Sequence, residues 1–345
     1  MSHEADSRAA APAEPVERGD IRKHVQECVT AQRLAGLPGA ARGRPAVSAA
    51  HAHNVRGSKY LAVPSPSGPA APQPIGSPSD RRNFVLISVL GHLRIGEKSP
   101  HQPLKSSRLR SLLTALALNE GTTVSQEVLS SWVWGESGGP ASVSGALYTC
   151  MSRLRDELVR RGHPELSAAI TTSTCGYTLC WDRSQIDASA FEDELRKARV
   201  RLRDGRLPEA LQHIESSLRL WAGPALADIP PTGPVERAST HLEEARFSAE
   251  LEEISINLKL RRPAEAREKA VGLAVKYPLS ESVSQVTMVA LEQSGRRSEA
   301  LSHYWNLHKR LADELGISPG ADLGNLYTRL LQGESLFSSA SPLPL

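Results

Sequence analysis

A short pattern, R-x-x-E-A, occurs three times in the second half of this chain and restricts that half to a helical architecture. It lies in "GRLPEAL" from residue 205, "RRPAEAR" from residue 261 and "GRRSEAL" from residue 295. The arginines of the last two copies, Arg262 and Arg296, are 34 residues apart, which is a period typical of stacked two-helix repeats. In such repeats the alanine packs between paired helices, and Arg and Gly mark the preceding turn. The alternative is three ordinary helix starts in an alanine-rich protein.

The region around these motifs has a uniform pattern. From about Asp187 onward the sequence indicates amphipathic helices only. We therefore expect an all-α array of helical hairpins over residues 185–333, followed by a polar tail at 334–345. Basic residues outnumber acidic ones before residue 181, and acidic ones are in excess after it. This distribution favours an anionic partner for the front half.

Residues 83–182 predict a mixed module instead. The run "FVLISVLGHLRIG" indicates two strands that join near Gly91 and His92. Two helices follow in "SSRLRSLLTALALNEG", which Ser106 or Ser107 can cap, and in "SQEVLSSWVWG", which starts at Ser125. A third helix is expected in "ASVSGALYTCMSRLRDELVRRG". After it, "AAITTSTCGYTLCW" indicates a hairpin whose turn ends at Gly176.

The third helix has two different faces. A buried stripe recurs at spacings of three or four, formed by Val143, Leu147, Cys150 or Met151, Leu154 and Leu158. The opposite face is polar and rich in hydroxyl groups, with Ser144, Tyr148, Ser152 and Arg155, and with Thr149 and Arg153 close by. Three helices of which the third has a polar outer face, followed by a β wing, form the layout of a winged helix-turn-helix. The expected fold class is therefore mainly α with small β hairpins, a winged helix-turn-helix domain followed by a tetratricopeptide-like helical array.

The first 82 residues have a different composition. They are rich in Pro, Ala and Ser, and "VPSPSGPAAPQPIGSPSD" at 63–80 is a run of turn-forming residues. Such a segment cannot bury enough apolar surface to offset the entropy lost on ordering. We expect a mostly disordered arm over residues 1–82.

The stretch "GHLRIGEKS" from Gly91 looks like a phosphate-binding loop but does not meet the requirements of one. Glu97 stands between Gly96 and Lys98, so the lysine is out of register, and Pro100 and Pro103 oppose the helix that must follow. No nucleophile elbow, metal-ligand spacing or Gly-rich cofactor loop occurs elsewhere. We therefore expect no enzymatic activity, no cofactor and no catalytic or metal site.

Targeting signals are also absent from the sequence. There is no run of about 18 apolar residues, and the N-terminus lacks the apolar core of a secretory signal. The expected location is the cytoplasm, in association with the nucleoid.

Several longer motifs together resemble one family. In the front module they are "FVLISVLGHLRI", "RLRSLLTALAL", "WGESGGPASVSGALYTCMSRLRDEL" and "GYTL"; in the second they are "ALQHIESSLRLWAGPALADI" and "SGRRSEALSHYWNLHKRLADELGISPGADL". These motifs resemble the Streptomyces antibiotic regulatory protein family, whose members pair an OmpR-type winged helix with a bacterial transcriptional activation domain. The resemblance covers about residues 83–333. It implies a pathway-specific transcriptional activator for a secondary-metabolite gene cluster.

Two positions depart from the family pattern. Gly145 stands where the family usually has Asn, and Arg108, Leu109 and Arg110 replace a K-Q-R-like signature. We therefore expect this chain to read a different DNA sequence from its relatives.

The resemblance places the third helix in the major groove of double-stranded DNA. Ser144, Tyr148 and Ser152 are then candidates for reading base edges. Further candidates hold phosphates or touch the minor groove or backbone from the wing: Arg108, Arg110, Arg153, Arg155, Thr171, Thr172 and Thr174. The alternative for each arginine is a solvated helix face.

The resemblance also implies partners beyond one DNA site. It suggests a dimer on tandem direct repeats near the promoter −35 region, in contact with RNA polymerase and its sigma factor. The helical array would supply self-association and polymerase contacts. A rival interpretation is a helical-repeat adaptor whose front domain binds protein and makes no specific contact with DNA.

Overall fold

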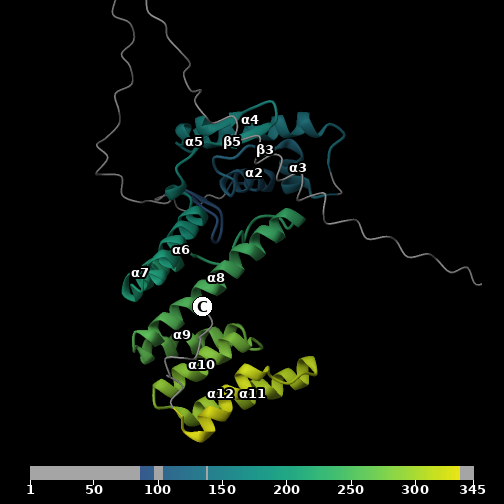
Figure 1. Ribbon diagram of the computed structural model, residues 1–345. Helices are drawn as coiled ribbons and strands as arrows, with labels where there is room; N and C mark the ends of the chain where they lie inside the picture. The colour runs from purple at the N-terminus through teal and green to yellow at the C-terminus, as the bar shows by residue number, and fades with distance from the viewer. Residues whose placement is uncertain (1–85, 97–103, 137–138, 335–345) are drawn as a thin grey trace, which may run out of the picture. The chain divides into compact units, whose positions relative to one another are not determined.

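A computed structural model describes residues 86–96, 104–136 and 139–334, and within these ranges the chain is mainly helical with two small sheets (Figure 1). The predicted arm at 1–82 and all but the first residue of the predicted polar tail lie outside the described residues. The same holds for residues 83–85, which begin the first predicted strand run. No helix in the described ranges combines the length and apolar character needed to cross a membrane.

The two first strands and the three helices predicted for the front module are present, although the side chain of Ser106, the N-cap residue of the first helix, makes no capping hydrogen bond. Two short strands pair antiparallel, with Ile87 opposite Ile95. Ser125 caps the second helix, since its Oγ accepts a hydrogen bond from the backbone N–H of Val128 at 3.3 Å. The bounds are β1 Ile87–Ser88, β2 Arg94–Ile95, α2 Ser107–Ala117, α3 Gln126–Trp134 and α4 Val143–Arg160.

The terminal hairpin differs from the prediction in two ways. The predicted run begins at Ala168, but Ala168 and Ala169 complete a short helix, α5 (Pro164–Ala169), which starts with Pro at its first turn. The hairpin itself, β4 (Ile170–Thr172) and β5 (Gly176–Leu179), is present, and β3 (Val124–Ser125) adds a third strand beside β5.

Gly176 makes the third strand possible. Its φ is 154°, and a Cβ at this position would lie 2.0 Å from the carbonyl oxygen of Val124. Only glycine lets β3 and β5 approach this closely.

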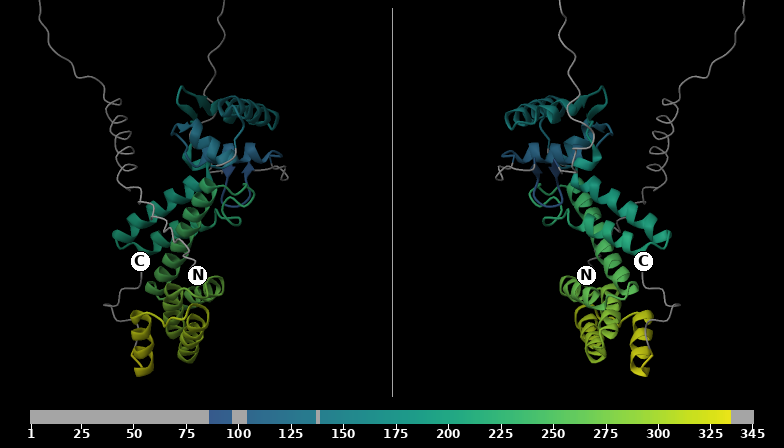
Figure 2. Two further views of the ribbon diagram at one scale, coloured as in Figure 1. Left: turned by 90° about the vertical axis from the view of Figure 1, so that its right-hand side faces the viewer. Right: turned by 90° about the vertical axis from the view of Figure 1, so that its left-hand side faces the viewer.

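The second part of the described chain contains helices only. A short 3₁₀ turn at Arg183–Gln185 leads into it, and neighbouring helices from α8 onward lie side by side, as the two side views of Figure 2 also show. The helices are α6 Asp187–Arg203, α7 Leu207–Leu218, α8 Gly233–Lys259, α9 Pro263–Lys276, α10 Glu281–Gln293, α11 Arg297–Leu315 and α12 Ala321–Gln332.

The three R-x-x-E-A motifs occupy equivalent places in this array. Each motif arginine is the N-cap of a helix, α7, α9 or α11. The motif alanines, Ala210, Ala266 and Ala300, are completely buried. The prediction that a small residue packs between paired helices is therefore confirmed, and a larger side chain at any of the three would clash.

The helix that precedes each motif also ends in the same way. The N–H of the motif arginine bonds to the carbonyl five residues earlier, as in Arg206 to Arg201, Arg262 to Asn257 and Arg296 to Leu291. The residue before the arginine is left-handed in all three, with φ of 72° at Gly205, 59° at Arg261 and 73° at Gly295. These are Schellman endings, in which glycine is favoured because it has no Cβ. Arg261 is the one copy that holds this conformation with a side chain.

Arg261→Gly should therefore stabilise the protein by up to about 1 kcal/mol, because the strain of a non-glycine residue at positive φ that it removes exceeds the loss of the exposed charge of Arg261 near Glu292. The matched control is Gly295→Ala, where a Cβ would meet nothing within 4 Å, so that only the backbone strain changes. Gly295→Ala should destabilise by a similar amount. Urea unfolding of the two variants measures both effects, and a loss of stability in Arg261→Gly would contradict the explanation.

The front strands are joined to the helical array through Asp187. This residue opens α6 and is buried, and its carboxylate accepts hydrogen bonds from the backbone N–H groups of Val89, Leu90 and Ala188 at 2.8–3.0 Å. A loop of the array continues the connection, since the N–H of Ala222 bonds to Leu90 O and that of Leu226 to Val89 O. One hydrophobic cluster runs through both parts. The front module and the first helices of the array therefore share a core.

Burial raises the pKa of Asp187 from its ordinary value of 3.8 to about 6, although the three N–H donors lower it. Because the folded pKa is the higher one, the contribution of this group to stability is fully present below about pH 3.8 and is lost as the pH rises through about 6.

Asp187→Asn cannot ionise, so its stability should lack this dependence. Between about pH 4 and pH 7 the unfolding free energy of the wild type should fall relative to that of the variant by up to about 3 kcal/mol. Urea unfolding at several pH values measures the difference. A difference that stays constant over this range would mean that Asp187 titrates normally.

Candidate nucleic-acid interface

Helix α4 separates into a buried and an exposed face, as the sequence predicts. Leu147, Met151, Leu154 and Leu158 have no solvent exposure, and Cys150 is also buried. Val143, at the first turn, is only half-buried. Because these residues fix α4 against the module core, the side chains on the other face are held in position.

The exposed face carries a row of side chains at intervals of four residues. Ser144, Tyr148 and Ser152 are all exposed, and 67% of Tyr148 is accessible to solvent. The same spacing continues to Asp156, which is also exposed and which the sequence analysis missed. The i+4 interval alone could have found it. Hydroxyl groups can donate to or accept from a base, and a carboxylate can accept from the amino group of cytosine.

A second row runs beside the first, through Gly145, Thr149 and Arg153. The hydroxyl of Thr149 donates to the carbonyl oxygen of Gly145 at 2.9 Å, which turns it back toward the helix. Gly145, at the start of α4, is exposed and has no positive φ. A Cβ at this position would lie 3.1 Å from the hydroxyl oxygen of Ser142, so the side chain of Ser142 occupies the space beside Gly145.

Two predicted arginines line one hollow beside this second row. The hollow has a volume of about 480 Å³, and Arg108 from α2 and Arg153 from α4 both contribute to it, with Trp134, Pro140 and Thr149. Both arginines are exposed. Within the described part of the chain neither has a carboxylate or hydrogen-bond partner. Their positive charges are therefore available to an anion.

Arg155 has a different environment. Its guanidinium donates to the carbonyl oxygen of Ile170 at 2.7 Å and to the hydroxyl of Thr172 at 2.9 Å, and it lies 6.0 Å from the ring centre of Tyr177. The side chain thus links α4 to the β4–β5 hairpin. Burial raises the pKa of Tyr177, and the charge of Arg155 partly offsets this effect.

The predicted wing residues lie on β4 and in the turn that connects β4 to β5. Thr171, Thr172 and Thr174 are exposed, and the turn is closed by a hydrogen bond from the N–H of Ser173 to Gly176 O at 2.9 Å. Thr172 already accepts a bond from Arg155, whereas the hydroxyl of Thr171 reaches Thr178 O only at 3.4 Å. The structure thus brings α4 and the hairpin tip together through Arg155.

Arg110 does not lie with the other candidates. Its Nε is 3.3 Å from the carboxylate of Asp228 and donates to the backbone oxygen of Asp228 at 3.0 Å, while another nitrogen donates to Leu104 O at 2.7 Å. Asp228 also accepts from the N–H of Leu93 at 2.8 Å. Only 18% of the Arg110 side chain is exposed. This environment is that of a structural ion pair, so Arg110 does not fit the predicted role of holding a phosphate.

The described ranges hold no group of three His, Cys, Asp or Glu side chains that could bind a metal ion. The candidate surface combines a row of hydroxyl groups, two guanidinium groups that have no partner among the described residues, and the threonines of the β4–β5 hairpin. These are the group types that contact base edges and phosphates in protein–DNA complexes.

The chain is similar to known proteins over both the front module and the helical array. The model of the bacterial transcriptional activator domain family matches residues 186–331, which cover α6 to α12. The chain is 32% identical over 251 residues to the regulatory protein AfsR of Streptomyces griseus, a match that covers 72% of this chain and 25% of AfsR. It is also 32% identical over 262 residues to the transcriptional regulator RedD of Streptomyces coelicolor, covering 75% of this chain and 74% of RedD.

Among solved structures the chain is similar to Mycobacterium tuberculosis EmbR, determined in complex with a low affinity phosphopeptide. The TM-score is 0.66 at 26% sequence identity, and the match covers 72% of this chain and 65% of the EmbR chain. This chain therefore spans about a quarter of AfsR and about two thirds of EmbR. Both matches are long enough to take in the front module as well as the helical array.

Proposed function

Because this chain belongs to the Streptomyces antibiotic regulatory protein family of transcriptional regulators, we propose that it is a sequence-specific DNA-binding activator of a secondary-metabolite gene cluster. In this proposal residues 83–182 form an OmpR-type winged helix-turn-helix domain, and α4 enters the major groove. The observation that carries it is the exposed face of α4, where a row of hydroxyl side chains lies beside two arginines that have no acidic partner among the described residues.

The two rows of α4 have different roles in this proposal. Ser144, Tyr148 and Ser152 face the base edges, where hydrogen bonds distinguish the four base pairs. Arg108 and Arg153 hold one or two phosphates at the edge of the groove, which fixes the register of α4 on the duplex. Arg155 acts indirectly, because it positions the hairpin whose threonines approach the backbone.

The helical array supplies the second half of an activator. We propose that it mediates self-association of two molecules on tandem direct repeats and contacts RNA polymerase and its sigma factor near the −35 region. Direct repeats place the DNA-binding domains head to tail, in contrast to the two-fold arrangement that gives palindromes. The match of α6 to α12 to a transcriptional activator domain supports this division.

The salt dependence of DNA binding can distinguish arginines that contact phosphates from an arginine that is paired within the protein. Arg108→Ala and Arg153→Ala should weaken binding to all DNA sequences and lower the slope of log K against log salt by about 0.9 for each lost phosphate contact. Arg110→Ala is the matched control, because its charge is already paired with Asp228. It should reduce thermal stability and leave the slope nearly unchanged. Fluorescence anisotropy from about 50 to 300 mM salt measures the slopes, and a full unit lost in Arg110→Ala alone would reverse the assignment.

Genomic DNA from the source organism can be used to test whether the protein binds specific DNA sequences. Fragmented genomic DNA is incubated with residues 81–345 at about 150 mM salt, where nonspecific binding is weak, and the retained DNA is sequenced. We expect enrichment of promoters with tandem direct repeats. Tyr148→Ala should change the preference at one or two positions of each repeat by about 1–3 kcal/mol per base pair.

The rival interpretation predicts a different outcome of the same experiment. A helical-repeat adaptor whose front module binds protein would retain genomic fragments uniformly or not at all. Tyr148→Ala would then leave the retained DNA unchanged. The full-length chain serves as the control for any contribution of residues 1–80.

A further inference from the structure

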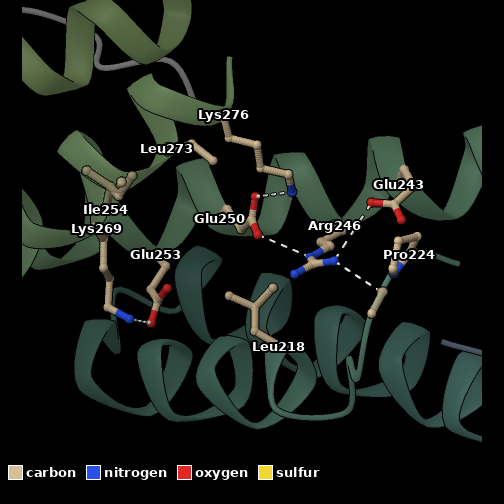
Figure 3. A pocket seen from close by; sticks show the side chains of 12 residues that line it. Leu218, Pro224, Glu243, Arg246, Glu250, Glu253, Ile254, Lys269, Leu273 and Lys276 are labelled. Carbon is tan, nitrogen blue, oxygen red and sulfur yellow. Dashed lines mark hydrogen bonds and ion pairs between the residues drawn. The ribbon is translucent and has the colours of Figure 1, made fainter. Parts of the chain in front are cut away.

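The helical array contains a cleft that is separate from the face of α4. It lies between α7, α8 and α9 and has a volume of about 590 Å³ (Figure 3). Leu218, Ile254 and Leu273 provide apolar surface, and six charged side chains surround it. This volume is within the range of sites that hold small organic molecules.

The charged side chains of the cleft neutralise one another. Glu253 is almost fully buried and pairs with Lys269 at 2.9 Å, and burial raises its pKa. Glu250 pairs with Arg246 at 3.1 Å, and Arg246 also lies 3.9 Å from Glu243. With Lys276 the lining holds three carboxylates and three cations. Because the net charge is zero, the cleft favours a neutral ligand over an ion.

One pair of these groups has unused hydrogen-bonding capacity. The Nζ of Lys276 lies 3.7 Å from Oε2 of Glu250, which is too far for a hydrogen bond. Oε2 accepts no hydrogen bond, and no donation by Lys276 is found in the described residues. A hydroxyl group could satisfy both, because it accepts one bond and donates another. Because Oε2 is itself buried, Lys276 must move aside to admit such a group; its side chain is 44% exposed, and its Nζ lies 4.9 Å from the ring centre of Tyr277.

Gly272 lines the cleft from an exposed position of α9. It lies in the interior of α9, where glycine destabilises a helix by up to about 1 kcal/mol relative to alanine. It has no positive φ, and a Cβ would meet nothing within 4 Å. Neither the backbone nor the packing therefore requires glycine here. Because Gly272 has no side chain, there is open space beside the apolar surface of the cleft.

The cleft also borders the loop that joins the array to the front module. Gly223 and Pro224 line it, and Arg246 and Glu243 hold this loop by bonds to Gly223 O at 3.4 Å and from the N–H of Ala225 at 2.8 Å. The residues on either side, Ala222 and Leu226, are those that bond to the backbone of Leu90 and Val89. An occupant of the cleft would thus contact the segment that carries the connection.

We propose that this cleft binds a neutral small molecule with an apolar body and a hydroxyl group, and that the occupant orders the loop at Gly223 and Pro224. The apolar body lies against Leu218, Ile254 and Leu273. The hydroxyl group bridges Glu250 and Lys276. This site is independent of the proposed DNA contacts, since it shares no residue with α4 or the β4–β5 hairpin.

The test uses 2-naphthol as the probe and the full chain without DNA. Isothermal titration calorimetry should give saturable binding with a dissociation constant of roughly 1 mM or tighter, the range expected of a ligand of this size. The methyl ether 2-methoxynaphthalene cannot donate to Glu250 and should bind about five- to tenfold more weakly. Hydrogen exchange should slow at the amides of Ala222 and Leu226 when 2-naphthol is bound.

Substitutions inside and outside the cleft test whether 2-naphthol binds there. Gly272→Leu fills the open space and should weaken 2-naphthol binding at least about tenfold, whereas Ala264→Leu, an exposed position of the same helix outside the cleft, should leave it unchanged. Circular dichroism checks that both fold. Lys276→Met, at an exposed side chain, is a second variant and should weaken binding about fivefold. No saturable binding, equal binding by Gly272→Leu and the wild type, or slowed exchange only at other amides would overturn the proposal.

Discussion

The buried carboxyl group of Asp187 joins the front strands to the helical array. Three backbone N–H groups, two from the first strand region and one from its own helix, converge on one buried side chain. The strand segment at Val89 and Leu90 has few backbone partners of its own, since β1 and β2 are two residues long. Without this carboxylate, buried N–H groups would lose their acceptors, at a cost of about 1–3 kcal/mol each. The hairpin is therefore completed by the helical array.

The arginines of the front module show how partners decide the role of a charge. Arg108 and Arg110 are two residues apart on α2 and therefore project from different faces of the helix, but the sequence does not show which of the two is paired within the fold. Arg110 is paired because Asp228, 118 residues later, lies beside it. Arg108 faces the hollow shared with Arg153. Charge that is already compensated within the fold contributes little to an external anion, so only the second kind supports binding to DNA.

Much of the fold could be predicted from the sequence because its signals are local. The stripe of α4, the cap at Ser125 and the alanines of the three motifs depend on spacing within one helix or one turn. The features that were missed depend on distant residues. Strand β3 exists only because Gly176 lets it approach β5, more than 50 residues along the chain. Helix α5 has one turn and a half, too short to leave a periodic pattern.

The candidate DNA-binding face could also be predicted only in those features that depend on spacing within one helix. Ser144, Tyr148 and Ser152 follow the period of one helix, and all three are exposed. The partners of Arg110 and Arg155 lie on other elements, so their environments could be found only in the folded chain. The cleft beside α8 left no sequence signal, because its charged residues come from two helices and balance one another.

The loop from Ala222 to Asp228 is the part of the structure through which the cleft and the front module could influence each other. It bonds to the front strands on one side and lines the cleft on the other. If the front module binds DNA and the cleft binds a ligand as proposed, the ligand would change the affinity for DNA only if it binds one arrangement of this loop more tightly than another. If it does, DNA must change the affinity for the ligand by the same factor. Asp187 limits the size of this effect, because it holds Val89 and Leu90 whatever the loop does. A loosened anchor at Asp187 would therefore increase coupling between the two sites and reduce stability at the same time.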